Sequence, residues 1–297
     1  MKALIFGASG QDGYYLSASC RRRGIEVVGI SRSASEGNHI KADISSYEQV
    51  EAIIRYHLPD FVFHLAANST TNHAALLENH HTICTGTVNV LESVLRYCPK
   101  AKVFITGSGL QFVNKGCAIS EKDPFQATSA YALSRIQSVY AARYFRSLGL
   151  QVYVGYLFHH ESPRRKLHHV SKKIAWAARQ IASGQLNTLE IGDISVRKEW
   201  TFAGDVVEGI LTLVFQDDVY EATIGSGVPY SIQDWLELCF EFVGLDWQKY
   251  VVLKEGFKAE YSCLFSNPAT INSLHWSPSV DFPSLAKMMM TSDLSSC

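Results

Sequence analysis

Residues 2–13 read KALIFGASGQDG and decide the fold. The apolar run at 2–6 predicts a buried strand, and the three glycines after it predict a tight turn that opens a helix. Such a turn lets the backbone approach a pyrophosphate, which the positive end of the helix attracts. We therefore expect a dinucleotide-binding turn whose candidate cofactor-binding residues are Gly7, Ser9, Gly10, Gln11, Asp12 and Gly13.

The alternation of short apolar runs and helical patterns continues along the first half of the chain. We expect strands at 26–30, 61–65, 102–106 and 152–157, and helices at 14–23, 46–56, 76–97 and 131–148. Helices of this length between strands make crossovers, so neighbouring strands are expected to be parallel.

The fold class expected is α/β, a Rossmann-like doubly wound parallel sheet with a smaller C-terminal substrate-binding lobe. Residues 1–158 would form the cofactor-binding domain, with later segments returning to it, and 159–297 mainly the lobe. In the lobe half we expect helices at 172–183, 204–215 and 231–243, and short strands at 189–191 and 200–202.

Composition excludes several classes of protein. The 297 residues include 27 Lys+Arg and 28 Asp+Glu, and a net charge of −1 gives no bulk field to recruit nucleic acid. No run of about 18 apolar residues predicts a membrane span. The seven cysteines form no CxxC and the eleven histidines no HExxH, so we expect reduced thiols, no metal site and a cytoplasmic location.

The end of the second predicted strand indicates which dinucleotide would bind. NAD sites usually have an acid there, whereas residues 29–33 read GISRS and offer the guanidinium of Arg32 to a 2′-phosphate. The alternative is a solvated loop charge; NADP(H) is preferred. Further candidate cofactor contacts, from KADIS and from the end of the third strand, are Asp43, Ile44, Leu65, Ala66 and Ala67. The alanine pair would equally serve close packing.

The start of the helix at 131–148 carries candidate catalytic residues. Tyr131 and Arg135 are four residues apart, which places them on one helix face. A cation there stabilises a phenolate and holds a ribose, so the phenol can exchange a proton while hydride moves. Arg is bulkier and more forked than the usual Lys. Ser108, in ITGSG at the end of the fourth strand, is the expected polariser. An ordinary helix with a surface Arg remains the alternative.

The chain resembles the extended short-chain dehydrogenase/reductase family, in its GDP-mannose 4,6-dehydratase branch. The segments that carry the resemblance are GASGQDGYYL from residue 7, LFHHESPRR at 157–165, SKKIAWAARQIASGQ at 171–185 and LEIGDISVRKEWTFAGDVVEGI at 189–210. The resemblance implies NADP(H) in the first lobe, a nucleotide-diphosphate sugar, GDP-linked, in the second, and a homodimer or homotetramer. The substrate-binding residues it implies are Ser69, His159, Glu161, Lys173, Arg197, Lys198 and Glu260.

The departures from the family bear on the reaction. The family's Thr-Ser-Glu supplies a glutamate that removes a proton at carbon 5 and drives the loss of water from carbon 6. Aligned through Phe104 and Phe112, the threonine falls on Ser108 and the glutamate on Leu110, which accepts no proton. The family's lysine is Arg135, the asparagine of its NHES segment is His159, and the arginine of its RPTEV segment is absent from FKAEY at 257–261.

Three functions stay open at this point. Hydride transfer at carbon 4 needs only the cofactor, Tyr131 and Ser108, which favours a 4-keto-6-deoxy-sugar reductase. A 4,6-dehydratase would need a substitute base, for which Glu121, Gln111 and His159 are candidates. A catalytically weak NADP-binding partner or sensor is the third.

Overall fold

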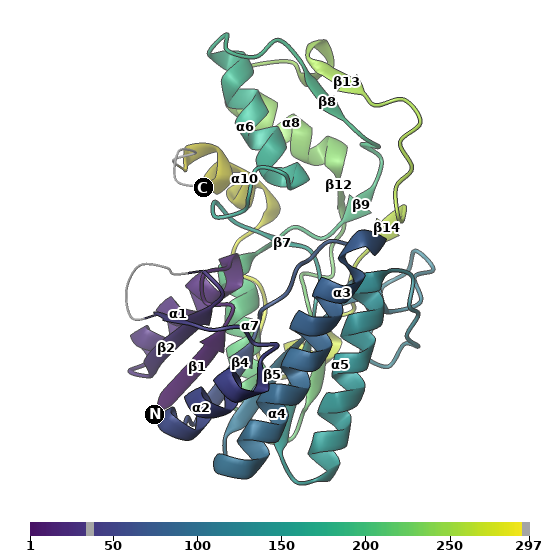
Figure 1. Ribbon diagram of the computed structural model, residues 1–297. Helices are drawn as coiled ribbons and strands as arrows, with labels where there is room; N and C mark the ends of the chain where they lie inside the picture. The colour runs from purple at the N-terminus through teal and green to yellow at the C-terminus, as the bar shows by residue number, and fades with distance from the viewer. Residues whose placement is uncertain (34–38, 293–297) are drawn as a thin grey trace.

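The computed structural model describes residues 1–33 and 39–292, and at its centre lies a seven-stranded parallel sheet (Figure 1). The order across the sheet is β11-β6-β5-β4-β1-β2-β3. The strands are β1 (Lys2–Phe6), β2 (Glu26–Ser31), β3 (His39–Lys41), β4 (Phe61–His64), β5 (Lys102–Ser108), β6 (Gln151–Leu157) and β11 (Glu221–Ile224). The chain reverses its direction across the sheet between β1 and β4, and ligands of such sheets bind beyond the carboxyl ends of the strands at that point.

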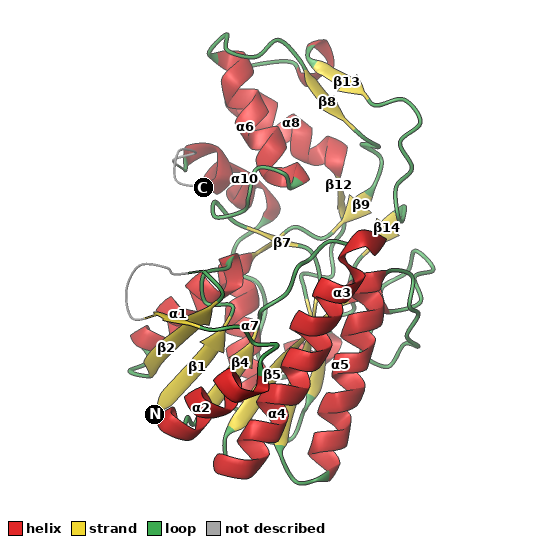
Figure 2. Ribbon diagram, in the orientation of Figure 1, coloured by secondary structure: helices red, strands yellow, loops and turns green. Residues whose placement is uncertain are grey.

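Helices cover both faces of the sheet (Figure 2). On one face lie α2 (Tyr47–His57), α4 (Gly86–Tyr97) and α5 (Ala130–Ser147), and on the other α1 (Gln11–Arg22) and α7 (Ala203–Val214). The central strands are buried on both sides, as in β1, where Leu4 and Ile5 have no exposed surface. This explains their continuous apolar sequences and confirms the expected doubly wound sheet.

The expected helix at 76–97 is not one regular helix. After a short 3₁₀ turn (His73–Ala75), α3 (Leu76–Asn79) passes through a π-helical segment (His80–Thr85) into α4. The π segment turns Cys84 toward α5, where its Sγ lies 2.9 Å from Oε1 of Gln137. Helical periodicity alone does not distinguish a π turn from an α turn, so this segment could not be predicted.

A second lobe lies above the carboxyl ends of the strands (Figure 1). Its own apolar core joins α6 (Val170–Ala182), α8 (Ile232–Phe242) and α10 (Phe282–Thr291). Short strand pairs complete it: β7 (His160–Glu161) with β10 (Thr201–Phe202), β8 (Leu189–Ile191) with β13 (Val251–Leu253), and β9 (Arg197–Lys198) with β12 (Tyr230–Ser231) and β14 (Cys263–Leu264). Although α7 and β11 follow residue 158 in the chain, both belong to the first domain. Strand β11 forms one edge of the central sheet, and α7 packs against a face of that sheet.

Several boundaries and elements differ from the expectation. Helix α1 begins at Gln11, three residues early, because extended Gly10 precedes it directly. The elements that the sequence did not predict are β3, β7, β9, β11 to β14, α10 and α9 (Ala269–Ser273). Most are two to four residues long, too short for periodicity to register. Across residues 1–33 and 39–292, no helix is long and apolar enough to cross a bilayer, and no group of three His, Cys, Asp or Glu could hold a metal ion.

Candidate functional site

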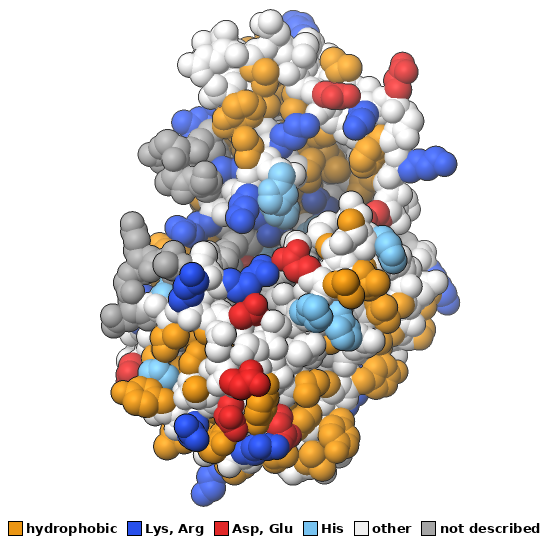
Figure 3. Space-filling view, in the orientation of Figure 1, with side chains coloured by type: hydrophobic (Ala, Val, Ile, Leu, Met, Phe, Trp, Pro, Cys, Tyr) orange, Lys and Arg blue, Asp and Glu red, His pale blue; other side chains and the backbone are white. Residues whose placement is uncertain are grey.

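A cavity of about 470 Å³ lies beyond the carboxyl ends of β1, β4 and β5, between the sheet and the second lobe. Figure 3 shows basic side chains gathered across the middle of this face of the molecule. Of the predicted site residues, the cavity is lined by Gly7, Ser9, Gly10, Gln11, Asp12, Gly13, Leu65, Ala67, Ser69, Ser108, Tyr131, Arg135 and His159. The structure thus brings the two ends of the predicted chemistry, the glycine turn and the tyrosine helix, into one cavity.

Two of the three glycines in the turn, Gly7 and Gly13, leave no room for a side chain. Gly7 has φ +93°, and a Cβ there would lie 2.7 Å from the backbone nitrogen of Ala66. At Gly13 a Cβ would lie 2.3 Å from the carbonyl oxygen of Gly7. No side chain caps α1, whose N-cap is Gly10. The amides of its first turn are therefore left for an anion, as a dinucleotide pyrophosphate requires.

Three predicted cofactor contacts lie outside this cavity, at the edge of the sheet. The guanidinium Nη2 of Arg32 donates to Oε1 of Glu78 at 3.1 Å. Asp43 accepts hydrogen bonds from the amide and hydroxyl of Ser45, and the backbone bond is the main reason why its pKa is lowered. The carbonyl of Ile44 accepts from Asn89. A fourth predicted cofactor contact, Ala66, is also absent from the cavity lining; its backbone packs closely against Gly7.

The candidate catalytic residues come from β5 and α5. Ser129 caps α5 by accepting the amide of Ala132 at 3.1 Å, and the helix begins at Ala130, one residue before Tyr131. Ser108, at the end of β5, forms a capping box with Gln111: its Oγ accepts from the amide of Leu110 at 3.2 Å, and its own amide donates to Oε1 of Gln111 at 2.8 Å. The Ser108 side chain is therefore held in place before any substrate binds.

Arg135 is buried and bound to the sheet. Its Nη1 donates to the carbonyl of Thr106 in β5 at 2.6 Å, and its guanidinium carbon lies 5.1 Å from the ring centroid of Tyr131. Its Nε is buried without a partner. The guanidinium of Arg135 therefore lies beside the ring of Tyr131, as predicted, although its Nη1 is bonded to β5.

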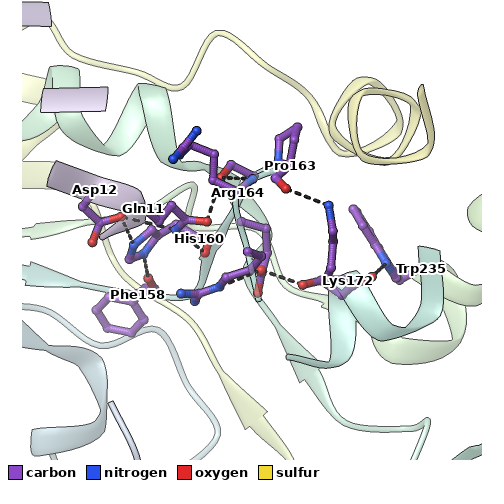
Figure 4. Close-up of polar contacts among 12 residues, drawn as sticks. Gln11, Asp12, Phe158, His160, Pro163, Arg164, Lys172 and Trp235 are labelled. Atoms are coloured by element: carbon purple, nitrogen blue, oxygen red, sulfur yellow. Dashed lines mark hydrogen bonds and ion pairs between the residues drawn. The ribbon is translucent and has the colours of Figure 1, made fainter. Parts of the chain in front are cut away.

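The segment His159–Arg165, which follows β6, connects the glycine turn to the second lobe (Figure 4). Nε2 of His160 lies 2.9 Å from Oδ1 of Asp12, and the hydroxyl of Ser162 donates to Oε1 of Gln11 at 2.8 Å. The guanidinium carbon of Arg164 lies 3.9 Å from the ring centroid of Tyr14. The first turns of α1 therefore contact three alternate positions of this segment.

The Asp12–His160 contact is an ion pair whenever His160 is protonated. Burial alone would raise the pKa of Asp12, but the charge and hydrogen bond of His160 outweigh it and lower the pKa to about 2. Burial alone would lower the pKa of His160, and the same carboxylate reverses this and raises the pKa above 6.5. Each group thus stabilises the charged form of the other.

Glu161 continues the network into the second lobe, away from the cavity. Its Oε2 accepts from Nε of Arg165 at 3.0 Å and from the hydroxyl of Ser171 at 2.6 Å. Burial opposes its ionisation, yet the charges of Arg165 and Lys198 lower its pKa. Glu161 therefore holds Arg165, which does line the cavity, and it is placed to act through that arginine rather than on a ligand.

His159 faces the cavity as a neutral imidazole. Its Nε2 lies 2.9 Å from the hydroxyl of Tyr261, and its Nδ1 is buried without a partner. Burial, together with the charges of Lys198 and Arg165, holds its pKa well below 6.5. One ring nitrogen is thus engaged, and the other is buried without a partner.

The remaining predicted substrate residues do not line the cavity. Lys173 donates to the carbonyl of Glu190 at 2.6 Å, and Arg197 to that of Pro229 at 2.9 Å. Lys198 is buried with its Nζ 4.5 Å from the ring of Trp200. Glu260 accepts from the hydroxyl of Thr71, which joins the two lobes.

Other residues lining the cavity were not among the predicted site residues. They are Asn68, Thr106, Gly107, Gly109, Leu110, Leu157, Phe158, His160, Arg164, Arg165, Lys166, His168, His169 and Leu264. The charged ones belong to the basic stretch HHESPRRKLHH, from which only His159 and Glu161 were selected. The high density of cations in that stretch was the sequence feature that could have indicated these cavity-lining residues.

Comparisons with known proteins show the family of the chain. A sequence profile of the GDP-mannose 4,6 dehydratase family matches residues 4–289. GDP-mannose 4,6 dehydratase 2 of Arabidopsis thaliana is 30% identical over 322 residues, covering 98% of this chain and 86% of the plant protein. The GDP-mannose 4,6 dehydratase of Homo sapiens is 28% identical, covering 82% and 72%.

Solved structures of lower identity share the fold. The UDP-glucose 4-epimerase of Thermotoga maritima with UDP-glucose superposes with a TM-score of 0.88 at 21% identity, covering 98% of this chain and 97% of that one. RMD from Pseudomonas aeruginosa complexed with NADPH gives 0.85 at 19% identity, with the same coverage.

Proposed function

Because the chain belongs to the GDP-mannose 4,6-dehydratase family, we propose that it transfers a hydride between NADP(H) and carbon 4 of a nucleotide-diphosphate sugar. The favoured reaction is reduction of a GDP-linked 4-keto-6-deoxy sugar. The observation that carries this choice is the chemistry of the cavity wall: hydride-transfer groups are present, and the base that dehydration needs is replaced by Leu110.

The residues of the chain would divide the work of the reduction as follows. The hydroxyl of Tyr131 would donate a proton to the oxygen on carbon 4, and Ser108 would donate a hydrogen bond to the same oxygen. Arg135 would stabilise the phenolate that Tyr131 leaves behind. The nicotinamide, when bound, supplies the hydride. Ser108 is already fixed by its capping box, which would limit the reorganisation needed on substrate binding.

The acidic groups around the cavity argue against dehydration. Among the residues that the structure describes, Asp12 is the carboxylate that lines the cavity, and it is paired with His160 at the glycine turn. Glu161 is bonded to Arg165 and Ser171 instead. A proton at carbon 5 would therefore meet no free carboxylate beside Ser108.

Support for the ligands comes from charge and from relatives. Arg164, Arg165 and Lys166 line the cavity and offer cations to a diphosphate. GDP is preferred because the curated relatives are GDP-mannose dehydratases, and NADP(H) because Arg32 lies at the end of β2. RMD, whose fold is the same, was solved with NADPH.

The reductase proposal is tested with NADPH and a panel of nucleotide-linked 4-keto-6-deoxy sugars. We expect NADPH consumption and a product heavier by two hydrogens with the GDP-linked member. Tight binding of NADP without turnover of any sugar would support a cofactor-binding partner or sensor instead.

A second candidate, a 4,6-dehydratase with a substitute base, is favoured by the family membership and by one side chain. His159 lines the cavity with an unpartnered Nδ1. The other two candidate bases are less suited: Glu121 accepts from the hydroxyl of Thr270 and is absent from the cavity lining, and Gln111 is an amide. Loss of one water from GDP-mannose without net consumption of NADP, abolished in His159→Gln, would establish this reaction.

A further inference from the structure

Leu110 lines the cavity next to the polar side chain of Ser108. The Leu110 amide donates to Oγ of Ser108 at 3.2 Å, so the two residues are in contact although Gly109 lies between them in the sequence. The Leu110 side chain lines the cavity and packs against the apolar cluster that contains Phe158 and Leu264.

Gly109, the residue before Leu110, leaves room for the aromatic ring of Phe158. A Cβ at Gly109 would lie 2.7 Å from the ring of Phe158, so the ring occupies the space that a side chain would take. Phe158 and Leu264 are almost completely buried, yet both reach the cavity. Leu110, Phe158 and Leu264 all line the cavity and belong to one packed apolar cluster, although they come from three separate segments of the chain. We call these three residues the apolar wall.

The polar side of the cavity begins directly beside this wall, at Ser108, whose Oγ accepts the Leu110 amide. Ser108 and Tyr131 offer hydroxyls, and His159 has an unpartnered ring nitrogen. A hexose reacting at carbon 4 has two chemically different neighbours: carbon 3 carries a hydroxyl, and carbon 5 carries carbon 6. A hydroxyl at carbon 3 suits the polar side. Carbon 6 suits the apolar wall only if it is a methyl group, because a hydroxyl there would be buried without a partner.

We propose that the apolar wall recognises the methyl group at carbon 6, and that Leu110 thereby sets the preference for 6-deoxy over 6-hydroxy sugars. This inference rests on the proposed function, because it needs carbon 4 to lie at Ser108 and Tyr131. A hydrophobic pocket rejects an added hydroxyl only moderately, so the preference should be about 10- to 100-fold. Leu110 acts here as a specificity-determining residue and takes no part in proton transfer.

The test uses two sugars that differ only at carbon 6, GDP-mannose and GDP-6-deoxymannose. Calorimetric titration of the NADP-loaded wild-type protein gives both Kd values, and NADPH absorbance reports oxidation at carbon 4. We expect the 6-deoxy sugar to bind about 10- to 100-fold more tightly. Equal affinities, tighter binding of the 6-hydroxy sugar, or no binding of either would overturn the proposal.

Two variants assign the preference to Leu110. Leu110→Met keeps an apolar side chain of similar volume and should keep the preference. Leu110→Gln offers a partner to the 6-hydroxyl and should bring the two Kd values within a few-fold of each other, chiefly by tightening GDP-mannose binding. An unchanged preference in Leu110→Gln, with a melting temperature like that of wild type, would remove Leu110 from the recognition of carbon 6.

The binding and turnover measurements test the apolar wall and the proposed hydride transfer independently of each other. A clear affinity preference without oxidation of either sugar would contradict the proposed hydride transfer and leave the apolar wall standing. Oxidation of both sugars at equal Kd and equal rate would support hydride transfer and overturn the role of the wall.

Discussion

Tyr131 and Arg135 stand at the centre of the proposed chemistry, and their surroundings differ. Both residues line the cavity and are largely buried, but Arg135 is also held by the hydrogen bond from its Nη1 to the carbonyl of Thr106. A lysine ammonium is a compact charge on a flexible stem, while the planar guanidinium donates from several fixed directions. The hydrogen bond to β5 therefore uses one N–H donor of Arg135, while the positive charge stays beside the ring of Tyr131.

Replacement of Tyr131 by Phe should abolish most of the turnover. The ring and its packing are kept, but the proton donor is lost, and general acid–base groups contribute about 10²–10⁴-fold in rate. The measurement is kcat for NADPH consumption with the reducible sugar. Tyr140→Phe, on the exposed face of the same helix, is the matched control. If Tyr131→Phe kept activity within a few-fold of wild type, proton transfer would have to be assigned to another group.

Arg32 should select NADP(H) over NAD(H). Charge-assisted hydrogen bonds contribute about 1.5–3 kcal/mol, so Arg32→Ala should weaken NADP binding by roughly ten- to a hundred-fold and leave NAD binding unchanged. Glu78 competes for the guanidinium, so Glu78→Gln should leave NADP binding as tight or tighter. Fluorescence titration with both dinucleotides measures the effect. Equal weakening of the two cofactors in Arg32→Ala would show that Arg32 does not contact the 2′-phosphate.

The connection between α1 and the segment His159–Arg165 joins the two halves of the site. Helix α1 begins in the glycine turn, and its first turn holds His160 and Ser162. From there Glu161 links to Ser171 of α6, whose carbonyl accepts the indole N–H of Trp235 in α8 (Figure 4). A continuous set of polar contacts therefore runs from the cofactor turn into the core of the second lobe.

The Asp12–His160 pair predicts a pH dependence of stability. The raised pKa of His160 gives stability that is complete below 6.5 and is lost as pH rises through the folded-state value. The lowered pKa of Asp12 gives stability that is complete above 3.8 and is lost as pH falls toward about 2. Wild type should therefore exceed His160→Gln in free energy of unfolding by the largest margin between pH 3.8 and 6.5.

Denaturant unfolding across pH measures this difference. We expect a margin of about 2 kcal/mol at its maximum, as for other hydrogen bonds between charged groups, shrinking as pH rises beyond neutrality. The exposed His81→Gln serves as the control and should give no such profile. A margin that does not change with pH would mean that His160 packs against Asp12 without carrying charge.

The strands of the central sheet that the sequence predicted are those buried on both faces. Strands such as β1 are covered on both faces, so their composition alone identifies them. The strand pairs of the second lobe involve two or three residues each and depend on partners distant in the chain, such as β9 with β14. No local pattern records such pairings.

The candidate site divides in the same way. The glycine turn, Ser108 and Tyr131 were predictable because the carboxyl ends of parallel strands meet at one edge of the sheet. The cations Arg164, Arg165 and Lys166 were not selected, because the irregular chain after β7 decides which of them reach the cavity. Sequence likewise could not show that Arg32 pairs with Glu78, a contact between residues 46 positions apart.

The whole molecule presents an apolar stripe on α5 that suits a second copy of the chain. Leu133, Tyr140 and Tyr144 are exposed and, at this spacing, share one face of the helix. Beside α5 lies α4, whose Val88 is also exposed. We expect a homodimer through α4 and α5, with a homotetramer as the larger alternative. Light scattering should report a monomer for Tyr140→Glu combined with Tyr144→Glu. A wild-type monomer, or an unchanged mass in this variant, would contradict this interface.

The most direct test of the proposed reaction is to supply the native protein with GDP-mannose and NADP, and separately with a GDP-linked 4-keto-6-deoxy sugar and NADPH, and to follow both sugars by mass. The account predicts that the keto sugar gains two hydrogens as NADPH is consumed, and that GDP-mannose loses no water, because Leu110 accepts no proton. A GDP-mannose product lighter by one water would contradict it and would transfer the role of base to another side chain, with His159 the first to replace.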